Sequence, residues 1–332
     1  MRTMHDESVI DSLTYTTFLQ LSKVRNDAVH LLDREMDYQD AAMMWSSCAW
    51  LIERRNPPVG TFTTVAETRM HHVHLRPDGD ADLPPVVFIH GALHDHSVWT
   101  LLARWFANHG WNVLAVDLPG HCKSEGDAPA SVEEAASFVA ALLDAAGVNK
   151  AALVGHSWGS LIALETAARL QDRVSHLVLV GTAYPMKVSP ALIEASLNEP
   201  LKALTMVNVF SRSTLAAPPS ALGPGTWVYG SSMALGKRVL TSNPKVNVFH
   251  RGFVACDTYA NGEQAVAAIT CPVLFVLGAQ DQMTQPKAAQ GLIKTAQAAG
   301  KAVQVVSLPV GHHQMTETPD ATLFAIRDFL GH

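Results

Sequence analysis

The chain has 332 residues, of which 48% are hydrophobic and 16% are charged. These proportions exclude an intrinsically disordered chain, and the length suits one α/β domain with an insertion or an extension. The 24 basic and 30 acidic residues give a formal net charge of -6 without a long run of either sign, so no nucleic-acid partner is expected.

Residues 1–60 predict an N-terminal helical extension. Apolar positions between residues 18 and 32 are spaced for one face of a helix, and Asn56-Pro57-Pro58 closes the region. The apolar segment 41–52 is 12 residues long, too short for a transmembrane segment. We expect these helices to pack on the core or on a second subunit, which would form a homo-oligomer. A lid or a membrane-surface helix is the alternative.

The cysteines and the first residues indicate a cytoplasmic protein. The acidic start MRTMHDESVIDSL lacks the basic and apolar regions of a signal peptide. The cysteines are far apart and form no CxxC pair, so they predict neither a zinc site nor a disulfide framework. The four are Cys48, Cys122, Cys256 and Cys271.

From residue 61, short β-like runs alternate with helix-like stretches. This alternation is typical of an α/β fold in which helices flank a mostly parallel central sheet. The predicted strands are an opening hairpin at 61–65 and 68–75, followed by 86–89, 112–117, 151–155, 174–181, 271–278 and 302–308. The predicted helices are 97–109, 131–146, 158–170, 286–299 and 319–330.

The alternation breaks at Tyr184, where the composition shifts to Pro, Ser, Leu and Met. We therefore expect residues 184–250 to form a mainly helical cap inserted into a core made of residues 61–183 and 251–332. Large apolar residues in the cap favour a small-molecule substrate with an apolar acyl or aromatic group, although they could simply pack the cap onto the core. They are Met186, Leu192, Leu204, Met206, Phe210, Trp227, Tyr229 and Phe249.

The segment Gly155-His156-Ser157-Trp158-Gly159 lies between a predicted strand and a predicted helix. A serine hydroxyl becomes an effective nucleophile only when it is presented on an exposed, tight turn beside a base. Glycines two positions away on each side allow the backbone to pass closely there. This pattern predicts Ser157 as a nucleophile.

Acyl transfer also needs two backbone N-H groups to hold the negative oxygen of the intermediate. One is expected from Trp158, just after the nucleophile. The second is expected from the loop after His90-Gly91, at Ala92.

The base and its orienting acid are expected on loops at strand ends. Gly311-His312 follows the strand at 302–308, with His313 as the competing base. Asp281 follows the strand at 271–278, whereas the loop after the preceding strand offers no carboxylate. The predicted catalytic residues, in the order Ser157, Asp281 and His312, need no cofactor and no metal.

The segments HGALHDHSVW, DLPGHCKS, GHSWGS, GAQD and GHHQMTETP resemble successive motifs of the α/β-hydrolase superfamily over residues 61–332. In that family the catalytic histidine belongs to a GH pair with Glu and Pro further on. Glu317 and Pro319 stand five and seven residues after His312, so the resemblance selects His312 over His313. Haloalkane dehalogenases and epoxide hydrolases of the superfamily carry Asp at the position of Ser157, which argues against both activities.

Other polar residues predict structural roles. Cys122 replaces a glycine common in the family and lacks the setting of a nucleophile. His94-Asp95-His96 lacks the spacing of a metal site. Alternating histidines at 71, 72 and 74 are expected to be solvent-exposed on an edge hairpin, and Asp117 and His121 to hold the loop after their strand.

Three functions fit these residues. The first is a carboxylic ester hydrolase that forms an acyl-enzyme on Ser157. The second is an enzyme that uses the same triad to cleave a carbon-carbon bond of a dienoate-type ketone, or to perform perhydrolysis. The third is a non-catalytic ligand-binding homologue, whose signature would be a missing triad member.

Overall fold

The computed structural model describes residues 59–65, 68–76, 79–80, 82–212 and 228–331. The expected N-terminal helices, Cys48 and Trp227 lie outside the described residues.

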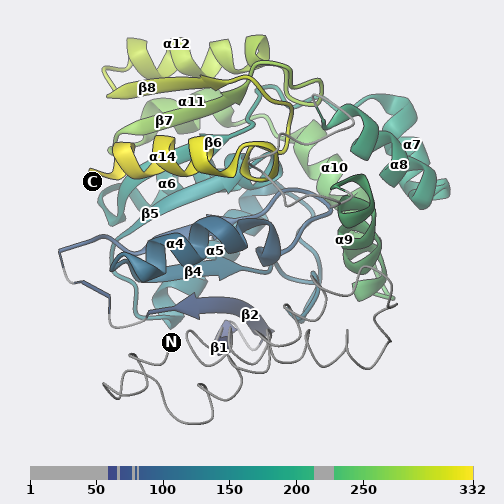
Figure 1. The fold of residues 1–332 in the computed structure, drawn as a ribbon, viewed down its shortest axis with the longest axis horizontal. Helices are drawn as coiled ribbons and strands as arrows, with labels where there is room; N and C mark the ends of the chain where they lie inside the picture. Colours follow the sequence, from purple (N-terminus) through teal and green to yellow (C-terminus); the bar gives the residue numbers. More distant parts are fainter. Residues whose placement is uncertain (1–58, 66–67, 77–78, 81, 213–227, 332) are drawn as a thin grey trace, which may run out of the picture. The chain divides into compact units, whose positions relative to one another are not determined.

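Eight strands form one sheet in the order β1-β2-β4-β3-β5-β6-β7-β8 (Figure 1). β2 runs antiparallel to β4, whereas the pairs from β4 through β3 to β8 are parallel. The strands are β1 (Val59–Val65), β2 (Thr68–Leu75), β3 (Val86–Ile89), β4 (Val113–Val116), β5 (Ala151–His156), β6 (Val174–Val180), β7 (Val273–Gly278) and β8 (Val303–Leu308). The predicted mostly parallel sheet is confirmed.

Helices cover both faces of the sheet, so the inner strands are buried on both sides. In β3, Val87 and Ile89 face one apolar cluster, and Val86 and Phe88 face the other, as the two-residue period of a strand requires. The first cluster includes residues of α5 (Val132–Ala145), α6 (Trp158–Leu170), α11 (Gly262–Ala268) and α12 (Gln290–Ala298). The second includes residues of α4 (Thr100–Asn108) and α14 (Pro319–Leu330).

The predicted helix 97–109 is two elements in the structure. A 3-10 turn, η1 (His96–Trp99), precedes α4. The Asp95 side chain caps this turn by accepting a hydrogen bond from the backbone N-H of Ser97 at 2.9 Å. Short 3-10 segments are common at helix starts. The predicted helix 286–299 is likewise two elements, η3 (Pro286–Ala289) and α12, whereas η2 (Gln171–Arg173), α11 and α13 (Gln314–Glu317) were not predicted.

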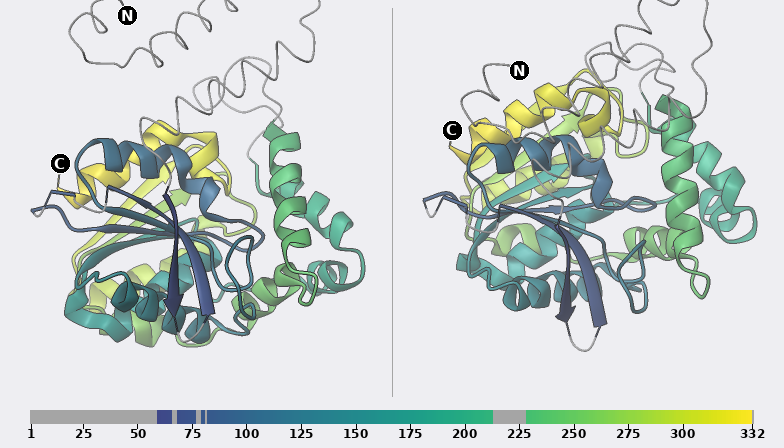
Figure 2. Two further views of the ribbon diagram at one scale, coloured as in Figure 1. Left: turned by 90° about the horizontal axis from the view of Figure 1, so that it is seen from below. Right: turned by 60° about the horizontal axis from the view of Figure 1, so that its bottom comes forward.

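Between β6 and β7 the chain forms the cap helices α7 (Pro190–Asn198), α8 (Pro200–Phe210), α9 (Val228–Ser242) and α10 (Val248–Thr258). Figures 1 and 2 show these helices together at one side of the sheet. They share a separate apolar cluster that includes Leu204, Val239 and Phe249. The mainly helical cap is therefore confirmed. Its boundaries at 184 and 250 stay a prediction, and α10 runs across residue 250.

Arg238 and Ser242 of α9 contact the loops of the core. Arg238 Nη2 lies 2.6 Å from Asp95 Oδ2, and Ser242 Oγ accepts a hydrogen bond from the N-H of Cys122 at 2.9 Å. Among the described residues, no helix has the length and apolar character needed to span a membrane.

Candidate functional site

Ser157 occupies a sharp turn between β5 and α6. Its backbone angles, φ 53° and ψ -121°, lie in a region that residues other than glycine rarely adopt. A Cβ at Gly155 would lie 2.0 Å from the carbonyl oxygen of Gly159, and one at Gly159 would lie 2.4 Å from that of Ile89. Both positions therefore require glycine, and the turn presents Ser157 at the end of the sheet.

The backbone around Ser157 is tied to neighbouring strands. The N-H of Ser157 donates to the carbonyl of Val180 at the end of β6, with a distance of 2.9 Å. Trp158 begins α6, so its N-H has no acceptor within the helix and lies at the positive end of the helix dipole. The structure thus places this amide at the start of α6, directly after Ser157, as the prediction for an oxyanion donor requires.

The loop after β3 lies directly against this turn. A Cβ at Gly91 would lie 3.2 Å from Ser157 Cβ, which places the following residue, Ala92, next to the serine. His90 anchors the loop, because its Nδ1 lies 2.8 Å from the carbonyl oxygen of Gly91 and its Nε2 accepts the N-H of Leu118 at 3.1 Å. Burial lowers the pKa of His90, so the imidazole is neutral and carries its proton on Nδ1.

His312 is paired with Asp281. His312 Nδ1 lies 2.8 Å from Asp281 Oδ2, and both side chains are buried. Asp281 also accepts hydrogen bonds from the backbone N-H groups of Met283 and Thr284, each at 2.8 Å. Burial alone would raise the pKa of Asp281, but the charge and hydrogen bond of His312 and the bonds from Thr284 hold it below its ordinary value. Asp281 is therefore an ionised carboxylate with a fixed orientation.

Thr284 is a residue of this site that the sequence did not single out. Its hydroxyl lies 2.7 Å from Asp281 Oδ2 and 2.9 Å from the carbonyl oxygen of Gly181. The spacing Asp281-x-x-Thr284, in which an acidic side chain accepts from the backbone two and three residues on, is the signal that could have revealed it.

Ser157, His312 and Ala92 line one cavity of about 260 Å³. Asp281 lies behind His312 and is not part of the lining. Apolar side chains form much of the wall, as a site for an apolar group requires. Of the apolar residues expected to bind substrate, four line it, whereas Leu204 and Phe249 are buried within the cap. The four are Met186, Leu192, Met206 and Phe210, and the structure adds Phe253, Cys256 and Met283.

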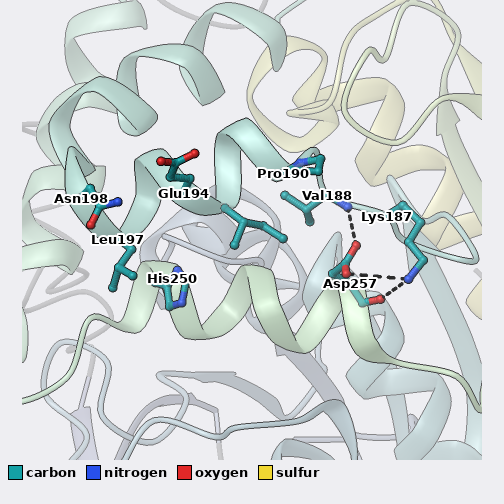
Figure 3. A pocket seen from close by; sticks show the side chains of 9 residues that line it. Lys187, Val188, Pro190, Glu194, Leu197, Asn198, His250 and Asp257 are labelled. Atoms are coloured by element: carbon teal, nitrogen blue, oxygen red, sulfur yellow. Dashed lines mark hydrogen bonds and ion pairs between the residues drawn. The ribbon is translucent and has the colours of Figure 1, made fainter.

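A second, wider pocket of about 540 Å³ lies between α7 and α10 (Figure 3). Lys187 and Val188 line both this pocket and the cavity with Ser157. Asp257 on α10 fixes that segment, since its carboxylate accepts the N-H of Val188 at 3.1 Å and its carbonyl accepts Lys187 Nζ at 2.6 Å. The two pockets therefore adjoin at residues 187 and 188.

His313, the competing base, occupies a different environment from His312. Its ring centroid lies 4.9 Å from that of His94 and 5.9 Å from that of His156. Burial lowers the pKa of all three, to about 3 for His94, so these imidazoles are neutral. His156 Nε2 donates to the carbonyl of His312 at 2.8 Å. Of the two adjacent histidines, His312 is thus the one bonded to Asp281.

The expectation that the histidines of β2 are exposed is wrong for His71 and His72, which are 1% and 0% exposed. His71 Nδ1 lies 2.7 Å from Asp117 Oδ2, because β2 pairs with β4 and Asp117 follows β4. The other oxygen of Asp117 lies 2.8 Å from His96 Nδ1.

The side chains of His71, His96 and Asp117 offer three possible metal ligands within 4.8 Å of one another. Their Nδ1 to Oδ distances of 2.7 and 2.8 Å are those of hydrogen bonds. Asp117 therefore holds the loop after its strand, as predicted. His121 supports the same loop, with Nδ1 3.0 Å from the carbonyl oxygen of Pro119.

Cys122 has a positive φ of 49°, which explains why a glycine would suit this turn. Burial, and then the charge of Asp95, raise the pKa of its thiol to about 12. The reactive thiolate is therefore not available near neutral pH.

A family model of the alpha/beta hydrolase fold matches residues 84–318. Lipase LipV of Mycobacterium tuberculosis is 32% identical over 130 residues, which are 39% of this chain and 49% of the lipase. The sn-1-specific diacylglycerol lipase ABHD11 of Mus musculus is 32% identical over 139 residues, which are 39% of this chain and 45% of that protein. The aligned regions thus span about half the length of these curated relatives.

Among solved structures, Est816, described as an N-acyl homoserine lactone degrading enzyme, superimposes with a TM-score of 0.66 at 22% identity. The match covers 81% of this chain and all of Est816, and shows a shared fold. Together with the family match over more than half of the sequence, the sheet order and the strand-to-helix turn at Ser157 show that the chain belongs to the α/β-hydrolase family.

Proposed function

We propose that the protein is a serine hydrolase of carboxylic esters. One observation carries the proposal: Ser157, on a strained strand-to-helix turn, opens into the same cavity as His312, whose Nδ1 is bonded to Asp281 at 2.8 Å. This arrangement supplies a nucleophile, a base and a group that orients the base. The names of the two lipase relatives agree with ester chemistry.

In this mechanism, His312 Nε2 takes the proton of Ser157 Oγ as the oxygen attacks the ester carbonyl carbon. The negative oxygen that forms is bound by the N-H groups of Trp158 and Ala92. The C-O bond then breaks, and His312 returns the proton to the leaving alcohol. Water, deprotonated by His312, then attacks the acyl carbon, the bond from that carbon to Ser157 Oγ breaks, and His312 returns the proton to Ser157 Oγ as the acid is released. Asp281 holds the Nδ1 proton of His312 throughout and stabilises the imidazolium without taking that proton.

The lining of the cavity supports an apolar acyl group as the preferred substrate. Met186, Leu192 and Met206 contribute thioether and aliphatic surface around the serine. Methionine is flexible and adapts to varied apolar shapes, so we expect a range of acyl groups to be accepted.

Labelling with a fluorophosphonate probe tests this function. The wild-type protein is expected to be labelled covalently, and Ser157→Ala to lose the label. Folding of both proteins is compared by circular dichroism. A folded wild-type protein that takes no label, or a Ser157→Ala variant that is still labelled, would contradict the proposal.

A further inference from the structure

Arg212 is a buried cation that the proposed reaction does not use. It follows α8 in the cap and is 7% exposed. Its Nη2 donates to Ser232 Oγ on α9. Its Nε and Nη1 have no hydrogen-bond partner within the described part of the chain. A buried guanidinium with unsatisfied N-H groups is costly, so this arrangement needs an explanation.

Arg212 remains positively charged in these surroundings. Burial lowers its pKa, and the charge of Glu317 opposes that shift. Glu317 is itself buried, and its Oε2 accepts the N-H of Gly311 at 3.3 Å. The neighbouring imidazoles of His94 and His313 are neutral. An arginine keeps its charge in such surroundings, because its ordinary pKa is far above neutrality.

A pocket of about 180 Å³ lies beside Arg212. Buried residues, Arg212, His313 and Met315, contribute to its wall, and the exposed residues Thr100 and Leu101 line it where it meets solvent. The linings of this pocket and of the cavity with Ser157 have no described residue in common. One water takes about 30 Å³ in the liquid, so the pocket has room for a molecule larger than one water.

The chemistry of the pocket fits an anion with several oxygens. Guanidinium N-H groups pair strongly with carboxylate and phosphate oxygens. The hydroxyls of Thr100 and Thr316 belong to the same lining and can add hydrogen bonds. The nearby acid Asp95 is already paired with Arg238 at 2.6 Å and with Ser97. Glu317 offsets part of the charge of Arg212, but the Nε and Nη1 N-H groups of Arg212 remain available to a ligand anion.

We propose that the pocket lined by Arg212, His313 and Thr316 binds a small oxyanion, a phosphate or a carboxylate, either free or carried by a small molecule. This binding site is separate from the ester-cleaving site and does not depend on the proposed hydrolysis. The ligand supplies acceptors for the Nε and Nη1 N-H groups that the described residues leave unpaired.

Isothermal titration of the full chain with inorganic phosphate, and separately with sodium acetate, tests this site. At constant ionic strength, the wild-type protein is expected to show saturable one-site binding of at least one of the two. Tighter binding of phosphate would identify a phosphate ligand, and tighter binding of acetate a carboxylate. Ser157→Ala is expected to bind as the wild type does, since the anion lies outside the cavity with the serine.

Variants then locate the site. Arg212→Gln removes the charge and is expected to weaken binding at least 10-fold, whereas Arg173→Gln, a change at a distant partly exposed arginine, is the matched control and should have no effect. Thr316→Glu places a carboxylate in the pocket wall beside Arg212, so it is expected to abolish anion binding and to raise the melting temperature. This second variant tests the site even if Arg212→Gln fails to fold. Absence of saturable binding of both anions to the wild type would overturn the proposal. So would unchanged binding in folded Arg212→Gln or in Thr316→Glu.

Discussion

The strand-end loops of the core and the helices of the cap line one cavity with different chemistry. The loops after β3, β5 and β8 bring Ala92, Ser157 and His312 to it, and the loop after β7 holds Asp281 behind His312. The cap contributes apolar side chains such as Leu192, Met206 and Phe210. In the proposed enzyme, the reactive groups thus belong to the sheet and the surface for the substrate belongs largely to the cap. Substitutions in the two regions should therefore change different kinetic parameters.

The largest effect is expected from the orienting acid of the loops. In Asp281→Asn, the amide no longer stabilises the correct tautomer of His312 or its charged form, so kcat should fall about 10⁴-fold. KM for a short ester should change little, because Asp281 does not line the cavity. Steady-state hydrolysis of p-nitrophenyl acetate measures both parameters. A loss below 10-fold in kcat would remove Asp281 from its proposed role.

The buried histidines of the loops predict a pH-dependent stability. Burial lowers the pKa of His94 and His121 to about 3, so between about pH 6.5 and 3 the unfolded chain binds protons that the folded protein does not. The free energy of unfolding is thus highest above about pH 6.5 and falls as the pH decreases through that range. Each of these histidines should remove up to about 2 kcal/mol between pH 6.5 and 5.

Urea denaturation at pH 7, 6 and 5 measures this dependence. His94→Gln should reduce the slope of the unfolding free energy against pH, whereas His109→Gln, a change at an exposed histidine, is the control and should leave the slope as in the wild type. The same slope in His94→Gln and wild type would show that His94 is not held neutral by burial.

A smaller effect is expected from Thr284, which positions Asp281. Thr284→Val loses the hydroxyl that lies 2.7 Å from Asp281 Oδ2 but keeps the shape of the side chain. Loss of a hydrogen bond to a charged group is worth about 1.5 kcal/mol or more, so kcat should fall about 10-fold. Thr284→Ser, which retains the hydroxyl, should restore most of the rate. If the serine variant is as slow as the valine variant, the hydroxyl is not the group that matters.

The smallest effect is expected in the cap, where it should depend on the substrate. Met206→Ala removes apolar surface from the cavity wall, so kcat/KM for an octanoyl ester should fall about 5-fold while that for the acetyl ester stays unchanged. Leu201→Ala, on the exposed face of the same helix, is the control. Equal losses of kcat/KM with both esters would mean that the cap affects the reactive groups. The core and the cap would then not have the separate roles proposed for them.

Much of the fold could be predicted because its strands are short apolar runs between helix-like segments. The buried strands β3, β5 and β7 lie where those runs predicted them, since strands buried on both faces carry an unbroken apolar signal. Burial of His71 was missed because its partner, Asp117, is distant in the sequence and is brought near only by the pairing of β2 with β4. The pattern of residues along a single strand contains no information about a partner on another strand.

The residues of the candidate site were found through motifs, and the structure brings Ser157, His312 and Ala92 to one cavity with Asp281 bonded to His312. Their roles in the reaction stay proposals. Thr284 and Arg212 were not found, because the spacing Asp281-x-x-Thr284 is shared by ordinary turns and a single arginine in a cap carries no signal in one sequence. Their significance depends on which oxygen atoms lie near them, and this is set by tertiary packing.

Mass spectrometry of a trapped acyl-enzyme shows directly whether Ser157 is the nucleophile. The protein is mixed with p-nitrophenyl acetate, quenched with acid within the first turnovers, and digested. One acetyl group is expected on the peptide containing Ser157, and Asp281→Asn is expected to accumulate it more slowly. Hydrolysis of the ester with the acetyl group on another residue, or undiminished hydrolysis in Ser157→Ala, would show that Ser157 is not the nucleophile.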